Sequence, residues 1–190
     1  METAKNIIHG HLYELLKKQD YLLIAIDGRC GSGKTTLAGS LKESLDCNII
    51  QMDHFFLRPN QRTKERLEEP GGNVDYERFL TEVLGPLKQN ISFSYRPFDC
   101  KKLKMSAPVF VNQKNINIIE GAYSCHPEFS GYYDLRIFLD VDKELQTKRI
   151  IKRNGKPAYE MFRDKWIPME ELYFDVYKIK ENSDVCLILM

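Results

Sequence analysis

The feature that most constrains this chain is a glycine-rich stretch at residues 28–35, Gly-Arg-Cys-Gly-Ser-Gly-Lys-Thr. It satisfies the pattern G-x-x-x-x-G-K-[ST], in which backbone N–H groups surround a polyphosphate. A short apolar run at 21–27 precedes it, and leucines spaced four residues apart follow it to about residue 45. This order of strand, glycine loop and helix predicts a phosphate-binding loop that opens a helix.

The loop pattern also predicts which ligands bind to it. Lys34 can reach the β- and γ-phosphates and so also takes part in catalysis, while the Thr35 hydroxyl can ligate Mg²⁺. ATP and Mg²⁺ are therefore the expected cofactors. The alternative is a chance glycine-rich turn, and the flanking strand and helix argue against it. The predicted nucleotide-binding residues are Gly28, Gly31, Ser32, Gly33, Lys34, Thr35 and Thr36.

Composition predicts one ordinary globular domain and excludes some function classes. The chain has 190 residues, of which 43% are hydrophobic and 29% charged, and its formal net charge is +1. No global field therefore favours nucleic acid or a membrane surface. The five scattered cysteines contain no C-x-x-C pair and indicate reduced thiols without a zinc site. Because neither a signal-peptide pattern nor a bilayer-length apolar run is found, we expect a cytoplasmic protein.

Near-continuous apolar runs predict the strands, and helical periodicity lies between them. The alternation of the two favours an α/β three-layer sandwich with a mainly parallel five-stranded sheet. Polar and apolar residues alternate over 91–111, which predicts an inserted β-hairpin. Pro168 is expected to kink or split the last helix. Strands are predicted at 21–27, 48–53, 117–121, 135–141 and 185–189, and helices at 4–18, 36–45, 76–87, 142–154 and 157–178.

Ligands of such sheets bind beyond the carboxyl ends of the strands, where two acids are of interest. Asp53 ends the second strand and can accept the proton of an acceptor hydroxyl aligned with the γ-phosphate. Glu120 ends the next strand and suits the acid that holds Mg²⁺ together with Thr35. The alternative for each acid is a structural cap at the end of a strand. Asp140 has a weaker claim, since the N-cap of the following helix explains it equally well.

Two further segments are interpreted as parts of a transfer site. Arg149 and Arg153 lie four residues apart on one helical face, so residues 142–156 are expected to form a lid over ATP. Both arginines are then catalytic, because they stabilise transition-state charge. A solvated basic face is the alternative. Residues 54–111 are interpreted as an acceptor-binding insertion. Its candidate contacts are Asp75, Tyr95 and Arg96, for which ordinary surface-loop chemistry is the alternative.

Together these segments resemble the uridine kinase and phosphoribulokinase family of P-loop small-molecule kinases. The resemblance spans roughly residues 21–155 in the family's order. It implies one P-loop NTPase domain of nucleoside-kinase type over residues 1–190. The segments that carry it are Ile26-Asp27-Gly28 leading into Gly31–Thr36, Met52–Phe56, Asn73–Tyr76, the Tyr95 hairpin, Ile119–Gly121, Phe138–Asp140, and Arg149 with Arg153.

The resemblance also implies an activity, the transfer of the ATP γ-phosphoryl group to a primary hydroxyl, typically the 5′-OH of uridine or cytidine. Asp53 would be the base, Asp75 would hold the ribose hydroxyls and Tyr95 would line the nucleoside pocket. The chain departs from the family in that residues 91–111 contain no histidine and the lid is short. A kinase for pantothenate or a sugar phosphate, and a regulatory P-loop NTPase without a small acceptor, therefore stay open. Family members often assemble, so a homo-oligomer is also open.

Overall fold

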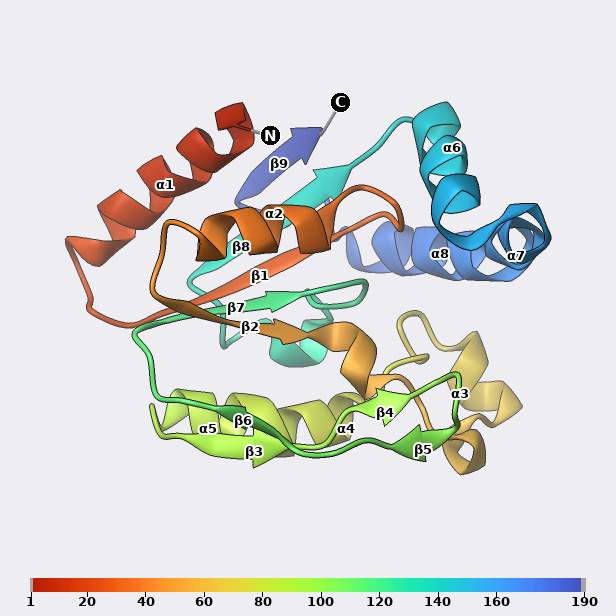
Figure 1. Cartoon of the computed structure of the whole chain (residues 1–190), viewed down its shortest axis with the longest axis horizontal. Helices are drawn as coiled ribbons and strands as arrows, with labels where there is room; N and C mark the ends of the chain where they lie inside the picture. The colour runs from red at the N-terminus through yellow and green to blue at the C-terminus, as the bar shows by residue number, and fades with distance from the viewer. Residues whose placement is uncertain (1, 189–190) are drawn as a thin grey trace.

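The computed structural model describes residues 2–188, and its centre is a five-stranded sheet in which every strand pair is parallel. The strand order is β2-β7-β1-β8-β9 (Figure 1). The predicted strands and the parallel sheet are confirmed, although residue 189 of the last predicted strand lies outside the described residues. The strands are β1 (Leu22–Gly28), β2 (Cys47–Gln51), β7 (Ile116–Glu120), β8 (Leu135–Asp140) and β9 (Val185–Ile188).

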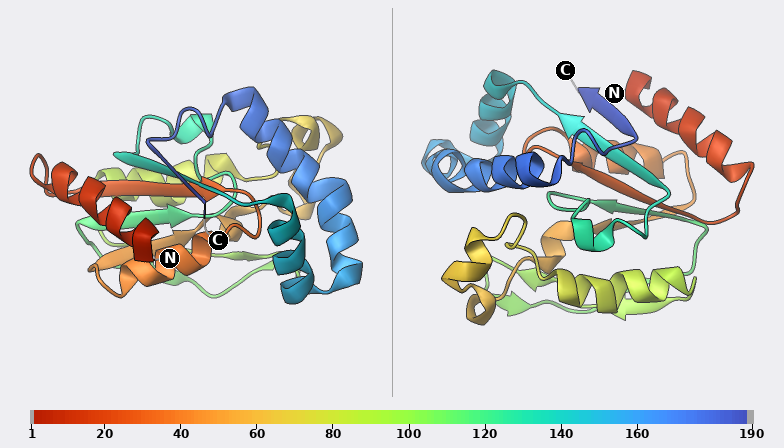
Figure 2. Two further views of the ribbon diagram at one scale, coloured as in Figure 1. Left: turned by 90° about the horizontal axis from the view of Figure 1, so that it is seen from above. Right: turned by 180° about the vertical axis from the view of Figure 1, so that it is seen from behind.

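Helices cover both faces of the sheet because its strands are apolar on both sides. Leu22 and Ile24 of β1 pack with the helices α1 (Glu2–Leu16) and α2 (Lys34–Lys42), whereas Leu23 packs with the opposite layer. That opposite layer includes α8 (Ile167–Tyr177) and the helical residues 76–88. Figure 2 shows the two helical layers on opposite sides of the sheet. The predicted three-layer sandwich is confirmed.

Two helical runs each contain a π-helical turn shortly before a proline. A proline has no N–H for the usual bond to the carbonyl four residues back, and its ring crowds that carbonyl. A π turn shifts the bonding to the fifth residue and relieves the crowding. The kink predicted at Pro168 therefore takes this form. One run is α4 (Tyr76–Phe79), Leu80–Leu84 and α5 (Gly85–Lys88), and the other is α7 (Lys156–Met161), Phe162–Trp166 and α8.

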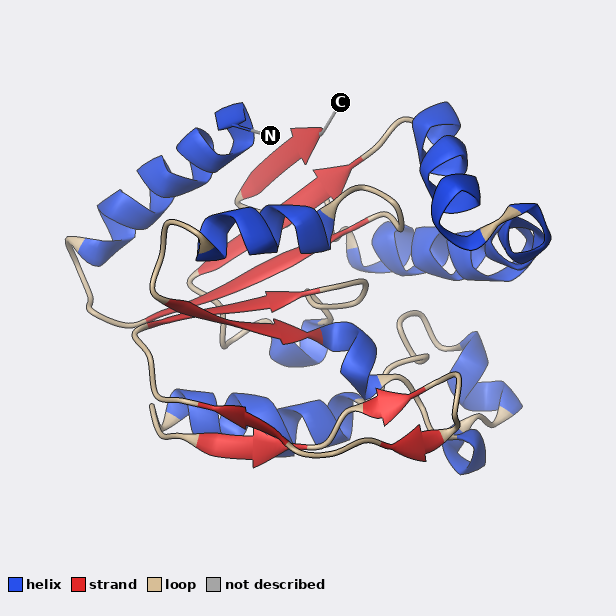
Figure 3. Ribbon diagram, in the orientation of Figure 1, coloured by secondary structure: helices blue, strands red, loops and turns tan. Residues whose placement is uncertain are grey.

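The insertion between β2 and β7 lies beside the sheet. Its antiparallel strand pairs are seen below the sheet in Figure 3. The hairpin predicted over 91–111 is present, with Phe93 opposite Val111 and Tyr95 opposite Val109. The insertion contains α3 (Lys64–Glu68), α4, α5, β3 (Phe93–Tyr95), β4 (Phe98–Asp99), β5 (Lys104–Met105) and β6 (Val109–Val111).

The remaining helix, α6 (Lys143–Asn154), follows β8 and lies near the carboxyl ends of the strands (Figure 1). Asp142 is its N-cap and accepts from the backbone N–H of Glu144 at 2.8 Å. Asp140 instead accepts from Arg29 Nε at 2.8 Å and from Lys180 Nζ at 2.7 Å, which gives it a structural role. No helix within residues 2–188 has the length and apolar character needed to span a membrane.

Candidate active site

The phosphate loop connects β1 to α2 through backbone conformations that only glycine adopts readily. At Gly28 φ is +133°, and a Cβ there would lie 2.0 Å from the carbonyl oxygen of Leu139 on β8. At Gly33, the residue before α2, φ is +106°. Any side chain at either position would be strained, and at Gly28 it would also push β1 and β8 apart. The glycines of the sequence pattern are thus required by the path of the chain.

Lys34 begins α2 and places its charge inside the loop. Its Nζ donates to the carbonyl oxygens of Gly28 at 2.5 Å and Arg29 at 3.0 Å, and only 9% of the residue is exposed. The N-terminus of α2 adds its partial positive charge at the same place. The loop is therefore an anion-binding cradle with a buried ammonium group at its centre.

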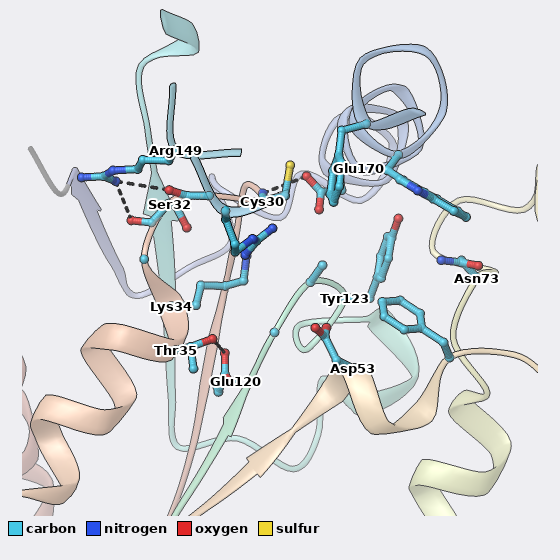
Figure 4. Close-up of a pocket in the computed structure, with 18 of the residues that line it drawn as sticks. Cys30, Ser32, Lys34, Thr35, Asp53, Asn73, Glu120, Tyr123, Arg149 and Glu170 are labelled. Carbon is cyan, nitrogen blue, oxygen red and sulfur yellow. Dashed lines mark hydrogen bonds between the residues drawn. The ribbon is translucent and has the colours of Figure 1, made fainter. Parts of the chain in front are cut away.

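A cavity of about 660 Å³ opens in front of the loop. Figure 4 shows Lys34 and Thr35 on one side of it, with Asp53, Tyr123 and Asn73 on the other. The cavity therefore joins the phosphate cradle to a second region in which an acceptor can lie. Its lining comprises Cys30, Gly31, Ser32, Gly33, Lys34, Thr35, Thr36, Asp53, Phe56, Arg62, Asn73, Cys100, Glu120, Gly121, Ala122, Tyr123, Arg149, Arg153, Phe162, Trp166 and Glu170.

Thr35 and Glu120, the two predicted metal ligands, are in contact. Thr35 Oγ1 donates to Glu120 Oε2 at 3.2 Å, and Glu120 is 3% exposed. Burial raises the pKa of Glu120, and the negative charge of Asp53 raises it further. A cation placed between these carboxylates would favour their ionised forms.

These oxygen donors fit Mg²⁺, which proteins commonly hold through one or two carboxylates together with substrate phosphates. Among residues 2–188, no group of three or more His, Cys, Asp or Glu side chains is arranged to hold a metal ion. The donor set therefore suits a metal that arrives with a nucleotide better than one held by protein ligands alone.

Asp53 lies on the 3₁₀ turn Met52–Phe55 that follows β2, and its exposed carboxylate lines the cavity. Gly121, directly after β7, allows this turn to approach. Its φ is +138°, and a Cβ there would lie 2.9 Å from Met52 Cβ and 3.5 Å from Asp53 Oδ1. The absence of a side chain at Gly121 thus allows Asp53 to lie next to Glu120.

The two arginines of α6 differ in their contacts, although both line the cavity. Arg149 Nη1 donates to the carbonyl oxygens of Gly31 and Ser32, at 3.2 and 3.3 Å. Arg153 is exposed, and its guanidinium lies 5.9 Å from the centre of the Phe162 ring. Arg149 therefore holds the outer side of the loop, and Arg153 lies on the exposed side of the cavity wall.

Asp75 does not line this cavity. Its carboxylate caps α4 by accepting from the N–H of Arg78 at 3.2 Å, and it accepts from Gln61 Nε2 at 2.8 Å. The guanidinium groups of Arg78 and Arg58 lie 3.5 and 3.6 Å away. With these partners Asp75 holds the insertion together, and its contact with ribose hydroxyls stays a prediction.

Tyr95 and Arg96 are also absent from the cavity lining. The Tyr95 hydroxyl is within hydrogen-bonding distance of His54 Nδ1, at 3.0 Å, and the residue is 3% exposed. Arg96 is exposed, and its Nε donates to the carbonyl oxygen of Ser106 at 2.9 Å. Both residues therefore stabilise the hairpin region outside the cavity, and their contact with substrate stays a prediction.

The sequence did not single out several residues that line the cavity. Arg62 and Asn73 come from the insertion; Asn73 begins the segment Asn73–Tyr76 that carries the resemblance, but neither residue was named as a contact. Glu170 and Trp166 come from a C-terminal run in which the sequence matched no motif. Tyr123, two residues after Gly121, could have been inferred from the rule that loops after parallel strands form the site. All five line the cavity.

Comparison by sequence finds a family model and named relatives. The model of the phosphoribulokinase / uridine kinase family matches residues 23–157. The uridine kinase of Clostridium novyi is 30% identical over 145 residues, 71% of this chain and 69% of that protein. The uridine kinase of Ureaplasma parvum is 23% identical over 180 residues, 86% of this chain and 87% of that one.

Solved structures resemble the fold. A possible uridine kinase from Bacillus stearothermophilus aligns with a TM-score of 0.72 at 19% identity, covering 98% of this chain and 100% of that one. A putative fructose transport system kinase from a Silicibacter species aligns with the same TM-score of 0.72 at 21% identity, covering 96% and 98%. At these identities the similarity supports the fold and not a choice of acceptor.

Proposed function

The chain belongs to the phosphoribulokinase / uridine kinase family, and on this basis we propose that it transfers the γ-phosphoryl group of ATP to a primary hydroxyl of a small molecule. The observation that carries the proposal is the position of Asp53. Its carboxylate faces the same cavity as Lys34 and the Thr35–Glu120 pair. A base, a phosphate cradle and a set of metal-ligand oxygens thus converge on one space, as phosphoryl transfer requires.

The residues have the following proposed roles. The loop N–H groups and Lys34 hold the phosphates. When bound, Mg²⁺ held by Thr35 and Glu120 would neutralise phosphate charge. Asp53 takes the proton of the acceptor hydroxyl as its oxygen bonds to the γ-phosphorus. The bond from that phosphorus to the β–γ bridging oxygen breaks, and ADP leaves.

The proposal also assigns functions to two segments. Residues 142–156 act as a lid that brings Arg149 and Arg153 to the transferring group. Residues 54–111 supply the acceptor side of the cavity. Arg149 on one wall of the cavity supports the lid, and Arg62 and Asn73 on the other wall support the acceptor side.

For the acceptor we propose a pyrimidine nucleoside, phosphorylated at its 5′-OH. The support is the recurrence of uridine kinases among the relatives, at 30% identity or less.

The same transfer to pantothenate or a sugar phosphate is a second candidate, which the charge of Arg62 favours. Arg62 lines the cavity and donates through Nε to the carbonyl oxygen of Leu57 at 3.0 Å, and no carboxylate among the described residues pairs with it. An acceptor with an anionic group would supply that partner.

A panel of acceptors tests both candidates. ADP formation is measured with ATP, Mg²⁺ and each of uridine, cytidine, pantothenate and several sugar phosphates, using wild type and Arg62→Gln. For an anionic acceptor the substitution should raise KM about tenfold or more, and for a nucleoside it should change KM less than about twofold. Arg58→Gln is the matched control, since Arg58 belongs to the same loop but pairs with Asp75 outside the cavity. Steady ATP hydrolysis that no acceptor stimulates would contradict the kinase proposal and favour a regulatory NTPase.

A further inference from the structure

The C-terminal helix α8 contacts the phosphate loop, although about 140 residues separate the two in the sequence. Its polar contacts reach the end of β1 and the first half of the loop and come from residues 170–173, and the Phe174 ring lies 5.6 Å from the Arg29 guanidinium. The polar contacts are the hydrogen bond from the Cys30 N–H to Glu170 Oε2 at 2.9 Å, the ion pair of Arg29 with Glu171, and the hydrogen bond from the Tyr173 hydroxyl to Asp27 Oδ2 at 2.8 Å.

Glu170 differs from the other two because it also lines the cavity. It is only 5% exposed, so its carboxyl group has exchanged water for the Cys30 N–H. Figure 4 shows Glu170 beside Cys30, above Tyr123. A buried acid that borders the space for a polyanion needs a physical reason, since its charge opposes phosphate binding.

The loop supplies that reason, because its peptide groups are held from outside at successive positions. The Cys30 N–H is held by Glu170, and the Cys30 carbonyl accepts from Gln146 Nε2 at 3.0 Å. The next two carbonyls, of Gly31 and Ser32, accept from Arg149. Side chains of α6 and α8 thus hold the peptide groups of three successive loop residues, Cys30 to Ser32.

Burial acts on Glu170 more strongly than the charges of its neighbours do. Lys34 is the nearby cation, Cys30 contributes both its N–H and its thiol, and Asp27 is a second buried acid. Tyr123 faces Glu170 from the loop after β7. Burial is the largest influence on the pKa of Glu170 and raises it, whereas the charge of Lys34 and the hydrogen bonds from Cys30 lower it. A neutral carboxyl group still accepts the Cys30 N–H through one oxygen.

We propose that Glu170 is a positioning residue for nucleotide binding, which fixes the Cys30 peptide through an acceptor oxygen so that the loop's N–H groups face the phosphates. The inference rests on the proposed function only in taking the loop's ligand to be a nucleotide. It assigns a role to the C-terminal helix, which lies outside the region that the family model matches.

The test compares Glu170→Gln, which keeps an acceptor oxygen, with Glu170→Ala, which removes it. Affinity for ADP with Mg²⁺ is measured by isothermal titration calorimetry without any acceptor. We expect Glu170→Ala to weaken ADP binding about tenfold or more, and Glu170→Gln to stay within about threefold of wild type. Asp175→Asn, an exposed carboxylate on the same helix, is the control and should bind as wild type does.

Each outcome decides the matter. If Glu170→Gln loses as much affinity as Glu170→Ala, the charge is what matters and the proposal is overturned. Wild-type affinity in both variants would equally overturn it. Thermal unfolding of the ligand-free variants detects a general loss of folding. Normal ADP affinity in Glu170→Gln would not be expected together with such a loss. Because ADP binding needs no acceptor, a chain that binds ADP but phosphorylates nothing would refute the proposed function alone, and a wild type that binds no ADP would refute both.

Discussion

His126 should make the stability of this protein depend strongly on pH. The residue is 3% exposed, and its ring lies between Tyr76 of the insertion and Tyr173 of α8, with ring centroids 4.8 and 6.2 Å away. Gly71 approaches so closely that a Cβ there would lie 2.6 Å from the ring. Burial, and secondarily the charge of Arg66, lowers the pKa of His126 to about 4. The folded protein therefore keeps this imidazole neutral in mildly acidic solution.

The sign and size of the effect follow from proton linkage. The ordinary pKa of histidine is 6.5, so between that pH and about 4 the unfolded chain binds a proton that the folded chain refuses. The stabilisation is complete above pH 6.5 and is lost as the pH falls toward 4. The full difference is worth roughly 3 kcal/mol, of which roughly 2 kcal/mol is lost between pH 7.5 and pH 5.0. His54, whose pKa burial also lowers, contributes in the same direction.

Urea unfolding at pH 7.5 and pH 5.0 measures this effect. Wild type should lose about 2 kcal/mol more on acidification than His126→Phe, which retains an aromatic ring but cannot take a proton. Val83→Ala is the control, because it removes a buried group without changing any titration and should shift the free energy of unfolding equally at both pH values. An equal pH dependence in wild type and His126→Phe would refute the assigned role of His126.

Two further substitutions test packing around the site. Tyr173→Phe removes the hydroxyl that donates to buried Asp27 at 2.8 Å and should lower the free energy of unfolding by about 1.5–3 kcal/mol. The control, Tyr177→Phe, should cost under about 0.5 kcal/mol. Equal losses for the two variants in urea titrations would contradict this expectation. Gly121→Ala places a Cβ 2.9 Å from Met52 Cβ and should displace the turn that carries Asp53. Its phosphoryl-transfer rate should fall about tenfold or more while ADP affinity stays within about twofold, and an unchanged rate would refute the close approach.

The sheet could be predicted from the sequence because its strands are apolar on both faces. Such runs as Leu22–Ile26 stand out without reference to the rest of the chain. The strand order could not be predicted in the same way. β7 pairs with both β1 and β2, although the whole insertion separates β2 from β7 in the sequence. Likewise the two π-helical turns depend on backbone bonding next to Pro86 and Pro168; the sequence indicated a kink or split at Pro168 and none at Pro86.

The residues of the candidate site also differ in how well the sequence predicted them. Lys34, Thr35, Asp53 and Glu120 were predicted because a local pattern and the ends of parallel strands place them, and the structure brings them to one cavity. Asp75, at the start of α4, instead serves as an N-cap and ion-pair partner within the insertion. The N-cap contact with the Arg78 N–H is local and follows from a helix start after Asp75. The contacts with Gln61 and Arg58 instead cross a loop, and no local pattern reports them.

The central claim is that Asp53 acts as the base in phosphoryl transfer from ATP, and Asp53→Asn tests it most directly. With the acceptor that wild type turns over best, transfer by the variant should fall about 10²- to 10⁴-fold, because the amide cannot take the proton of the hydroxyl. Calorimetric affinity for ADP with Mg²⁺ should stay within about threefold of wild type, since the phosphate loop is untouched. Near-normal turnover by Asp53→Asn would contradict the account.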